Sequence, residues 1–139
     1  MRIPKSVRRN RRGAAAVEFA IVAPLLFLVV FGIIEVGRVM MVQHVLTNAA
    51  REGARQAAFN SSTTASVQEV VEAYVEDAFV DIEPEDVAVS PDPSAADSGS
   101  PVSVTVTLPF EDVSWLPTPK YFQGMSLQAT ATMRREIAQ

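Results

Sequence analysis

The stretch that decides the fold is AAAVEFAIVAPLLFLVVFGII, residues 14–34, in a chain of 139 residues. Glu18 is its one charged residue, and the run from Phe19 to Ile34 carries no charge. As an α-helix, this stretch would measure about 31 Å at ~1.5 Å per residue, which matches a hydrocarbon core of ~30 Å. The sequence therefore predicts one membrane-spanning helix.

The charges on the two sides of this stretch differ in sign. Six of the twelve Lys and Arg residues lie in residues 1–12, whereas all sixteen Asp and Glu residues lie at or after Glu18. Basic flanking residues mark the cytoplasmic side of a membrane helix. We therefore expect a single-pass protein with a basic leader (residues 1–13) in the cytoplasm and the remainder outside it. This topology explains the basic arm without nucleic acid.

A cleavable secretory signal is the less favoured alternative for the same stretch. The apolar run is longer than the usual core of a signal peptide. The residues that follow it, Glu35, Val36, Gly37 and Arg38, contain no small-x-small cleavage site. A retained membrane anchor is therefore the better interpretation.

The helical pattern continues beyond the predicted span. Residues 35–59 contain no Pro and keep apolar residues near helical spacing, at Val36, Val39, Met40, Leu46, Ala50, Ala54 and Ala57. We predict one helix over residues 14–58, whose outer half forms an amphipathic spine. Pro24 is expected to kink the membrane half, because proline frees a backbone carbonyl.

A second helix is predicted at the start of the head, residues 60–139. Ser66 followed by Glu69 has the pattern of a capping box that opens a helix. The apolar stripe that follows comprises Val67, Val70, Val71, Tyr74, Val75, Ala78 and Phe79.

The rest of the head predicts a small antiparallel sheet. A short strand starts at Val87, and apolar residues alternate with polar ones over 102–108 and 127–133. A Pro/Ser/Asp loop precedes the second strand, and a surface loop over 109–125 is expected to place Trp115 against the sheet. The fold class is therefore α+β, with the sheet packed on the second helix and on the spine.

No catalytic or metal-binding arrangement emerges from the sequence. His44 is the only histidine and Cys is absent, so Ser/His/Asp sets and His- or Cys-based metal sites lack their parts. The acidic cluster Asp81, Glu83, Glu85 and Asp86 lacks the pattern of a calcium loop, and a solvated turn is the simpler interpretation. We expect no enzyme, no cofactor, no metal and no small-molecule substrate.

Glu18 is the residue that composition leaves unexplained. An ionised carboxylate costs about 2.5–3.5 kcal/mol at the centre of a membrane helix, and less near the interface. An interfacial carboxylate that reaches back to Arg11 or Arg12 is one explanation. The residues around it indicate another.

The segment RRGAAAVEF, residues 11–19, resembles the processing site of type IV prepilins. In that pattern a basic leader ends in Gly, cleavage follows it, and Glu is the fifth mature residue, followed by Phe and an apolar helix. More closely, residues 11–58 resemble the TadE-like family of pseudopilins, encoded with the Tad (tight adherence, Flp-type) pilus machinery. The similarity includes Pro24, Glu35, Gly37 and Arg38 and the block Gly53-Ala54-Arg55.

The resemblance implies a precursor in the inner membrane that a prepilin peptidase cuts between Gly13 and Ala14. The product would be a minor pseudopilin that assembles with other pilins or pseudopilins of the Tad machinery through Glu18 and Phe19, without catalysis. Cleavage would leave an α-amino group on Ala14, one helical turn from Glu18. These opposite charges can neutralise each other, within one subunit or between neighbours.

A signal-anchored extracytoplasmic binding or sensor module is the alternative from another class. It predicts an intact N-terminus, no requirement for Glu18, and a ligand pocket in residues 60–139. The assembly hypothesis predicts a mature chain that starts at Ala14. The mass of the mature protein distinguishes the two.

Overall fold

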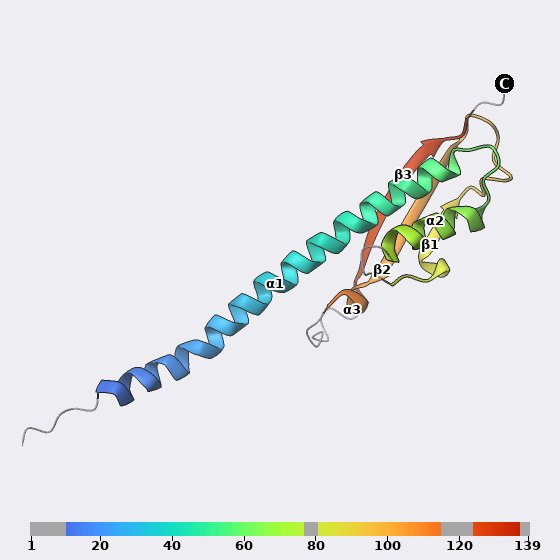
Figure 1. Cartoon of the computed structure of the whole chain (residues 1–139). Helices are drawn as coiled ribbons and strands as arrows, with labels where there is room; N and C mark the ends of the chain where they lie inside the picture. The colour runs from blue at the N-terminus through green and yellow to red at the C-terminus, as the bar shows by residue number, and fades with distance from the viewer. Residues whose placement is uncertain (1–10, 77–80, 115–123, 137–139) are drawn as a thin grey trace, which may run out of the picture. The chain divides into compact units, whose positions relative to one another are not determined.

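The computed structural model describes residues 11–76, 81–114 and 124–136. The elements in chain order are the helices α1 (Arg11–Ala57) and α2 (Thr64–Glu76), a 3₁₀ turn η1 (Pro84–Asp86), the strands β1 (Val87–Ser90) and β2 (Pro101–Pro109), a short helix α3 (Phe110–Val113) and the strand β3 (Ser126–Arg134) (Figure 1). Long apolar helix, second helix and three-stranded antiparallel sheet together give the α+β, pilin-like layout that the sequence predicts.

The chain divides into two compact units, Met1–Ile34 and Glu35–Gln139. The helix α1 begins in the smaller unit and ends in the larger one, and its bounds confirm the helix predicted over residues 14–58. Pro24 lies inside α1 without ending it. The larger unit therefore contains the second half of α1 together with all the other elements.

The sheet has the strand order β1-β2-β3, and both pairs are antiparallel. The central strand β2 alternates regularly, with Val102, Val104, Val106 and Leu108 buried and the residues between them partly exposed. On the exposed face, hydroxyl groups contact each other across β2 and β3, 2.8 Å apart at Ser103–Thr132 and 2.9 Å at Thr105–Thr130. The period-two pattern thus predicted both long strands.

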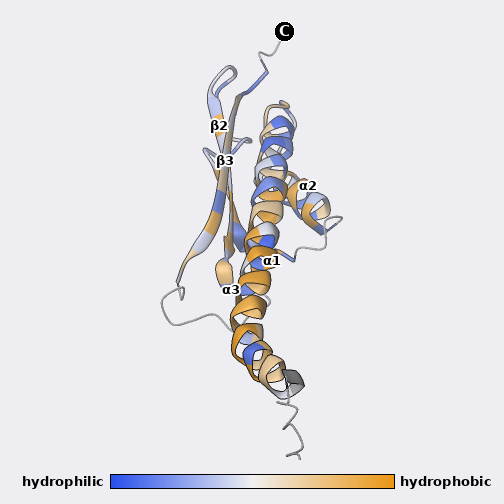
Figure 2. Ribbon diagram, turned by 90° about the vertical axis from the view of Figure 1, so that its left-hand side faces the viewer, coloured by the Kyte–Doolittle hydropathy of each residue, from blue (hydrophilic) through white to orange (hydrophobic). Residues whose placement is uncertain are grey.

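The core of the larger unit lies between the sheet and two helices. Figure 2 shows α1 and α2 on the same side of the sheet. Buried Leu46 and Ala50 come from α1, and buried Val67, Val71 and Val75 come from α2. The valines lie at i, i+4 and i+8, so one face of α2 supplies all three contacts.

At Gly53, α1 comes very close to its neighbours. A Cβ atom at this position would lie 2.5 Å from Cγ2 of Val71 and 3.1 Å from Cγ1 of Val104. Both distances are shorter than ordinary van der Waals contact between carbon atoms, about 3.5–4.0 Å. A glycine here therefore allows α1 to pack against α2 and β2 together.

The structure corrects the predicted start of the second helix. It begins at Thr64, and the reciprocal capping contacts join Thr63 and Ser66 rather than Ser66 and Glu69. The backbone N–H of Thr63 donates to Oγ of Ser66 at 3.0 Å, and the N–H of Ser66 donates to Oγ1 of Thr63 at 3.2 Å. Ser66 thus fills the place that Glu usually takes in a capping box, because its hydroxyl also accepts a hydrogen bond.

One predicted packing position was wrong, because Tyr74 of α2 is 41% exposed. On α1, Val36 and Met40 keep the apolar spacing of the spine and are 56% and 61% exposed. Val70 is half-buried, while Ala78, Phe79 and Trp115 lie outside the described residues. The predicted surface loop over 109–125 begins with the helix α3.

Candidate membrane and assembly site

The predicted processing and assembly residues Gly13, Ala14, Glu18 and Phe19 all lie in the first turns of α1, and all are exposed. The bond between Gly13 and Ala14 falls in the first helical turn, where the backbone N–H groups have no intrahelical partner. Glycine has no Cβ, so no side chain at Gly13 obstructs a close approach to the backbone.

Ala14 and Glu18 are one helical turn apart, so they lie on the same side of α1. This is the spacing that an α-amino group on Ala14 needs to meet the carboxylate of Glu18. The side chains of Arg11 and Arg12 lie outside the described part of the chain. The alternative ion pair of Glu18 with these arginines therefore stays a prediction.

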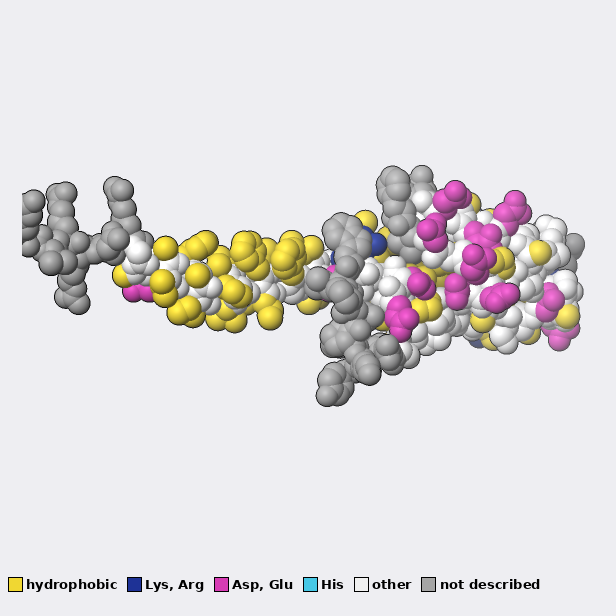
Figure 3. Space-filling view, turned by 90° about the horizontal axis from the view of Figure 1, so that it is seen from below, with side chains coloured by type: hydrophobic (Ala, Val, Ile, Leu, Met, Phe, Trp, Pro, Cys, Tyr) yellow, Lys and Arg dark blue, Asp and Glu magenta, His cyan; other side chains and the backbone are white. Residues whose placement is uncertain are grey.

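After Glu18, large apolar side chains are exposed around the whole circumference of α1. Phe19 is 65% exposed and Leu28 70%, and the other large apolar residues up to Ile34 are exposed as well. Figure 3 shows this part of α1 covered with hydrophobic side chains. A helix that is apolar all round belongs in an apolar environment. It is also long enough to cross a membrane, which suits single-pass anchoring.

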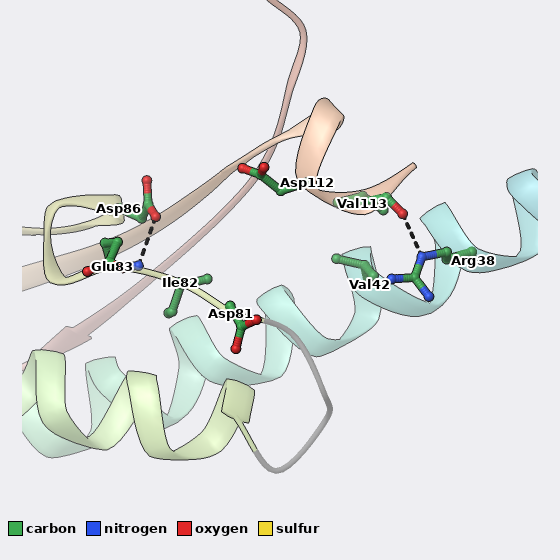
Figure 4. Close-up of a pocket in the computed structure, with 8 residues that line it drawn as sticks. All are labelled: Arg38, Val42, Asp81, Ile82, Glu83, Asp86, Asp112 and Val113. Carbon is green, nitrogen blue, oxygen red and sulfur yellow. Dashed lines mark hydrogen bonds between the residues drawn. The ribbon is translucent and has the colours of Figure 1, made fainter. Parts of the chain in front are cut away.

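The larger unit contains a cavity of about 420 Å³ (Figure 4). Its lining comes from three parts of the chain: α1, residues 81–86, which include η1, and α3. The residues are Arg38, Val42, Asp81, Ile82, Glu83, Asp86, Asp112 and Val113. The lining therefore combines four carboxylates and one guanidinium with three apolar side chains.

Hydrogen bonds within the lining explain part of this arrangement. Nε of Arg38 donates to the carbonyl of Val113 at 2.5 Å, which joins α1 to the end of α3. The N–H of Glu83 donates to Oδ2 of Asp86 at 3.0 Å and caps η1. Within the described residues, no group of three or more His, Cys, Asp or Glu is placed to hold a metal ion.

Sequence reasoning found only part of this cavity. The acidic turn at 81–86 was recognised, but not that Asp112 and Arg38 join it from elements far away in the chain. Arg38 belongs to the block of residues that carried the family resemblance, which was the one available indication. His44, the lone histidine, is exposed on α1.

Two further carboxylates have altered acidity. Arg55 donates hydrogen bonds to Glu52 on the exposed side of α1, which lowers the pKa of Glu52 and raises that of Arg55. In the loop after β1, the hydroxyl and the backbone N–H of Ser94 both donate to Oδ1 of Asp92, at 2.7 and 2.9 Å. They lower the pKa of Asp92.

Fold and exposed apolar helix together define a class: a membrane-anchored protein with a pilin-like α+β layout. Residues 13–55 match the model of a family described as TadE-like protein, which confirms the resemblance inferred from the sequence. That family is associated with the Tad pilus and is structural rather than catalytic. Neither the curated proteins nor the solved structures gave a match.

Proposed function

We propose that this chain is a minor pseudopilin of a Tad-type pilus assembly or secretion system. A prepilin peptidase cuts it after Gly13, and the mature chain assembles with other pilins or pseudopilins through α1. One observation carries the proposal: the prepilin-like residues Gly13, Ala14, Glu18 and Phe19 open a helix that is apolar all round, within the residues that match the family.

The proposed organisation follows from the distribution of charge. Residues 1–13 form a cytoplasmic leader, 14–58 form the helix that crosses the inner membrane and continues as the spine, and 60–139 form the extracytoplasmic α+β part. The basic residues before the span and the acidic excess after it support this orientation.

Glu18 has a defined role in this proposal. Processing leaves a charged α-amino group on Ala14 at the start of an apolar helix, and an unpaired charge there is costly. The carboxylate of Glu18 neutralises it, in the same subunit or in a neighbour. The helix dipole also favours a negative charge near its N-terminus.

The N-terminus of the mature protein is the decisive measurement. Full-length protein extracted from cells with an active prepilin peptidase should lack residues 1–13 by mass spectrometry, and should keep them when the peptidase is inactive. Gly13→Val should block cleavage. Gly37→Val is the matched control, since Gly37 lies in the same helix with nothing within 4 Å of its Cβ position. A native chain that keeps its leader beside an active peptidase would disprove the proposal.

Substitution of Glu18 separates anchoring from assembly. Glu18→Ala makes α1 more apolar, so insertion and cleavage should proceed. Association with other pilins and piliation should fail, because the Ala14 ammonium loses its partner. Glu18→Gln should fail in the same way, since it lacks the charge. Full piliation by either variant would return Glu18 to the role of an interfacial carboxylate.

A signal-anchored binding module is the second candidate, and the cavity beside Arg38 is the observation that favours it. It predicts that the leader stays attached and that Glu18→Ala is silent. It also predicts that charge reversal at Asp112 abolishes ligand binding in the cavity. The mass measurement on the native chain therefore decides between the two candidates.

A further inference from the structure

The three-stranded sheet leaves two edges, and they are built differently. The strand β1 has four residues and is enclosed by prolines, Pro84 in the turn before it and Pro91 directly after it. Gln68 of α2 also donates to the carbonyl of Val87 at 3.2 Å. Short length, adjacent proline and a side chain bonded to the backbone are ways in which proteins protect a sheet edge.

The other edge strand, β3, lacks two of these protections and has the third at one residue, because Gln43 of α1 donates to the carbonyl of Gln128. It has nine residues, and none is Pro. Its register with β2 runs without a bulge from Ser126 to Arg134, and Arg134 is its one charged residue. In Figure 1 the strand lies at the outer margin of the sheet. A long, regular edge with a single charge at its end is a template for pairing with another strand.

The hydrogen bonds show which backbone groups of β3 face outward. Gln43 of α1 donates to the carbonyl of Gln128 at 2.9 Å, so this carbonyl points away from β2. In an antiparallel ladder, outward-facing and inward-facing residues alternate. Thr130 and Thr132 therefore also direct their N–H and C=O groups outward. Residues that point their backbone groups outward form non-hydrogen-bonded pairs with β2, and side chains lie closer together in such pairs. The short hydroxyl contacts of Thr130 and Thr132 to β2 agree with this assignment.

We infer that the free edge of β3, centred on Thr130 and Thr132, binds an extended strand of another protein and adds it to the sheet antiparallel to β3. Main-chain hydrogen bonds to these two residues supply the affinity, and side chains on the two faces supply the selectivity.

The chemistry of the partner strand follows from the two faces of β3. On the exposed face the hydroxyls of Thr130 and Thr132 form a polar row, which suits Ser or Thr in the partner. On the other face Ala131 is half-buried and Met133 is 37% exposed, which suits small apolar residues. Arg134 is exposed, and its guanidinium makes a long 3.5 Å contact to the carbonyl of Gly99. Charge complementarity therefore calls for a carboxylate at this end.

A second copy of the chain suits this edge less well. The chain from Gln43 of α1 to Ala58, one residue past α1, runs alongside the chain from Gln128 of β3 to Glu136, two residues past β3. Both run in the same direction, because Gln43 donates to the carbonyl of Gln128 and the N–H of Glu136 donates to the carbonyl of Ala58 at 2.8 Å. The two segments have similar lengths, about 22 Å of helix and about 27 Å of strand. Two β3 strands paired antiparallel would thus turn their α1 helices in opposite directions.

Subunits anchored in one membrane with the same topology present α1 in the same direction, so they cannot form that pair. The strand β1 of a second copy runs the correct way for parallel pairing but offers four residues, one of them bonded to Gln68. The exclusion of a second copy as the partner therefore rests on the proposed single-pass topology. Binding at the edge itself can be measured without any pilus component, so the two proposals fail separately.

The test uses the full-length chain in detergent micelles and the peptide acetyl-Asp-Val-Thr-Val-Thr-Val-Thr-Val-amide. Alternate N-methylation on its outer edge prevents the peptide from stacking further. In antiparallel pairing its Asp meets Arg134. Saturating peptide should slow hydrogen exchange of the Thr130 and Thr132 amides by about tenfold or more, as expected for at least nine-tenths occupancy. Exchange at Val89 on β1 should not change.

Two variants make the result specific. Thr132→Pro removes an outward N–H that β2 does not use, so protection should be lost while the thermal unfolding curve is kept. If that variant folds poorly, Arg134→Glu provides the test. It should weaken binding of the peptide that starts with Asp and strengthen binding of the same peptide with Lys in place of Asp. Absence of protection at Thr130 and Thr132 would overturn the inference. Protection that rises with protein concentration, without peptide, would replace the foreign strand with a second copy.

Discussion

The two halves of α1 place opposite kinds of residue on their surfaces. Between Phe19 and Ile34 most side chains are large, aliphatic or aromatic, and exposed. Between Ala49 and Ala57 the side chains that face the core are small, and they are fully buried. Within one helix, large exposed apolar side chains therefore suit contact with lipid, and small buried side chains suit packing against protein.

The difference has a physical origin. Lipid needs only a continuous apolar surface, so bulky side chains on every side are favourable there. Packing against a sheet and a second helix requires the backbone to come close, which alanines and Gly53 permit. In the larger unit, stability therefore depends on the fit of a few small residues, whereas in the smaller one it depends on overall apolarity.

The largest effect is expected from a charge in the core of the larger unit. Val71 is fully buried between α1, α2 and β2, and Val71→Asp should cost about 4 kcal/mol or more. This approaches the whole stability of an ordinary domain, about 5–15 kcal/mol. The larger unit should lose its cooperative unfolding transition, measured by circular dichroism in micelles, while membrane association persists. Ala73→Asp, an exposed position of the same helix, should be nearly silent.

The converse experiment places the same charge in the apolar half of α1. Leu28→Asp should disfavour insertion by about 2.5–3.5 kcal/mol and move protein out of the alkali-resistant membrane fraction. Leu28→Ala, which shortens the side chain without a charge, should remain inserted. The unfolding transition of the larger unit should match the native one in both variants. A Leu28→Asp protein that stays fully membrane-bound would argue against the span.

The features that the sequence predicted are local along the chain, whereas those it missed depend on contacts between distant segments. Both long strands and α1 could be predicted, because periods of 2 and of 3.6 residues are local properties of the chain. The start of α2 was misplaced because a serine at position 66 can close a capping box as well as open one. Tyr74 follows the apolar period of α2, yet the width of the facing sheet decides whether it is buried.

The candidate sites show the same division. Gly13, Ala14, Glu18 and Phe19 are contiguous enough to be recognised as a motif. The cavity was not predicted, because Asp112 and Arg38 meet there only after the chain has folded. The free edge of β3 likewise depends on strand order, which the alternating pattern does not determine.

A glycine-to-alanine pair sharpens the comparison within one helix. Gly53→Ala gains up to about 1 kcal/mol of helix propensity but forces a methyl group against Val71 and Val104, at a cost of about 1–3 kcal/mol. We expect net destabilisation, seen as a lower melting temperature of the larger unit. Gly37→Ala has open space around its new methyl group and should be neutral or slightly stabilising. Equal shifts in the same direction would contradict the close approach at Gly53.

The smallest effect concerns pH and should be confined to the larger unit. The pKa of Asp92 is lowered from its ordinary value of 3.8, first by the hydroxyl and then by the N–H of Ser94. A carboxylate whose pKa is lower in the folded state stabilises fully above its unfolded pKa, and this contribution disappears as the pH falls through the folded pKa. Asp92→Asn should therefore be slightly less stable than the native chain at neutral pH. The difference should shrink as the pH falls below 3.8 and vanish below the folded pKa. Ser94→Ala, which keeps the N–H but removes the hydroxyl, should show the same trend with a smaller amplitude. Thermal unfolding followed from pH 7 to pH 2 measures both, and a difference that grew on acidification would contradict the assigned sign.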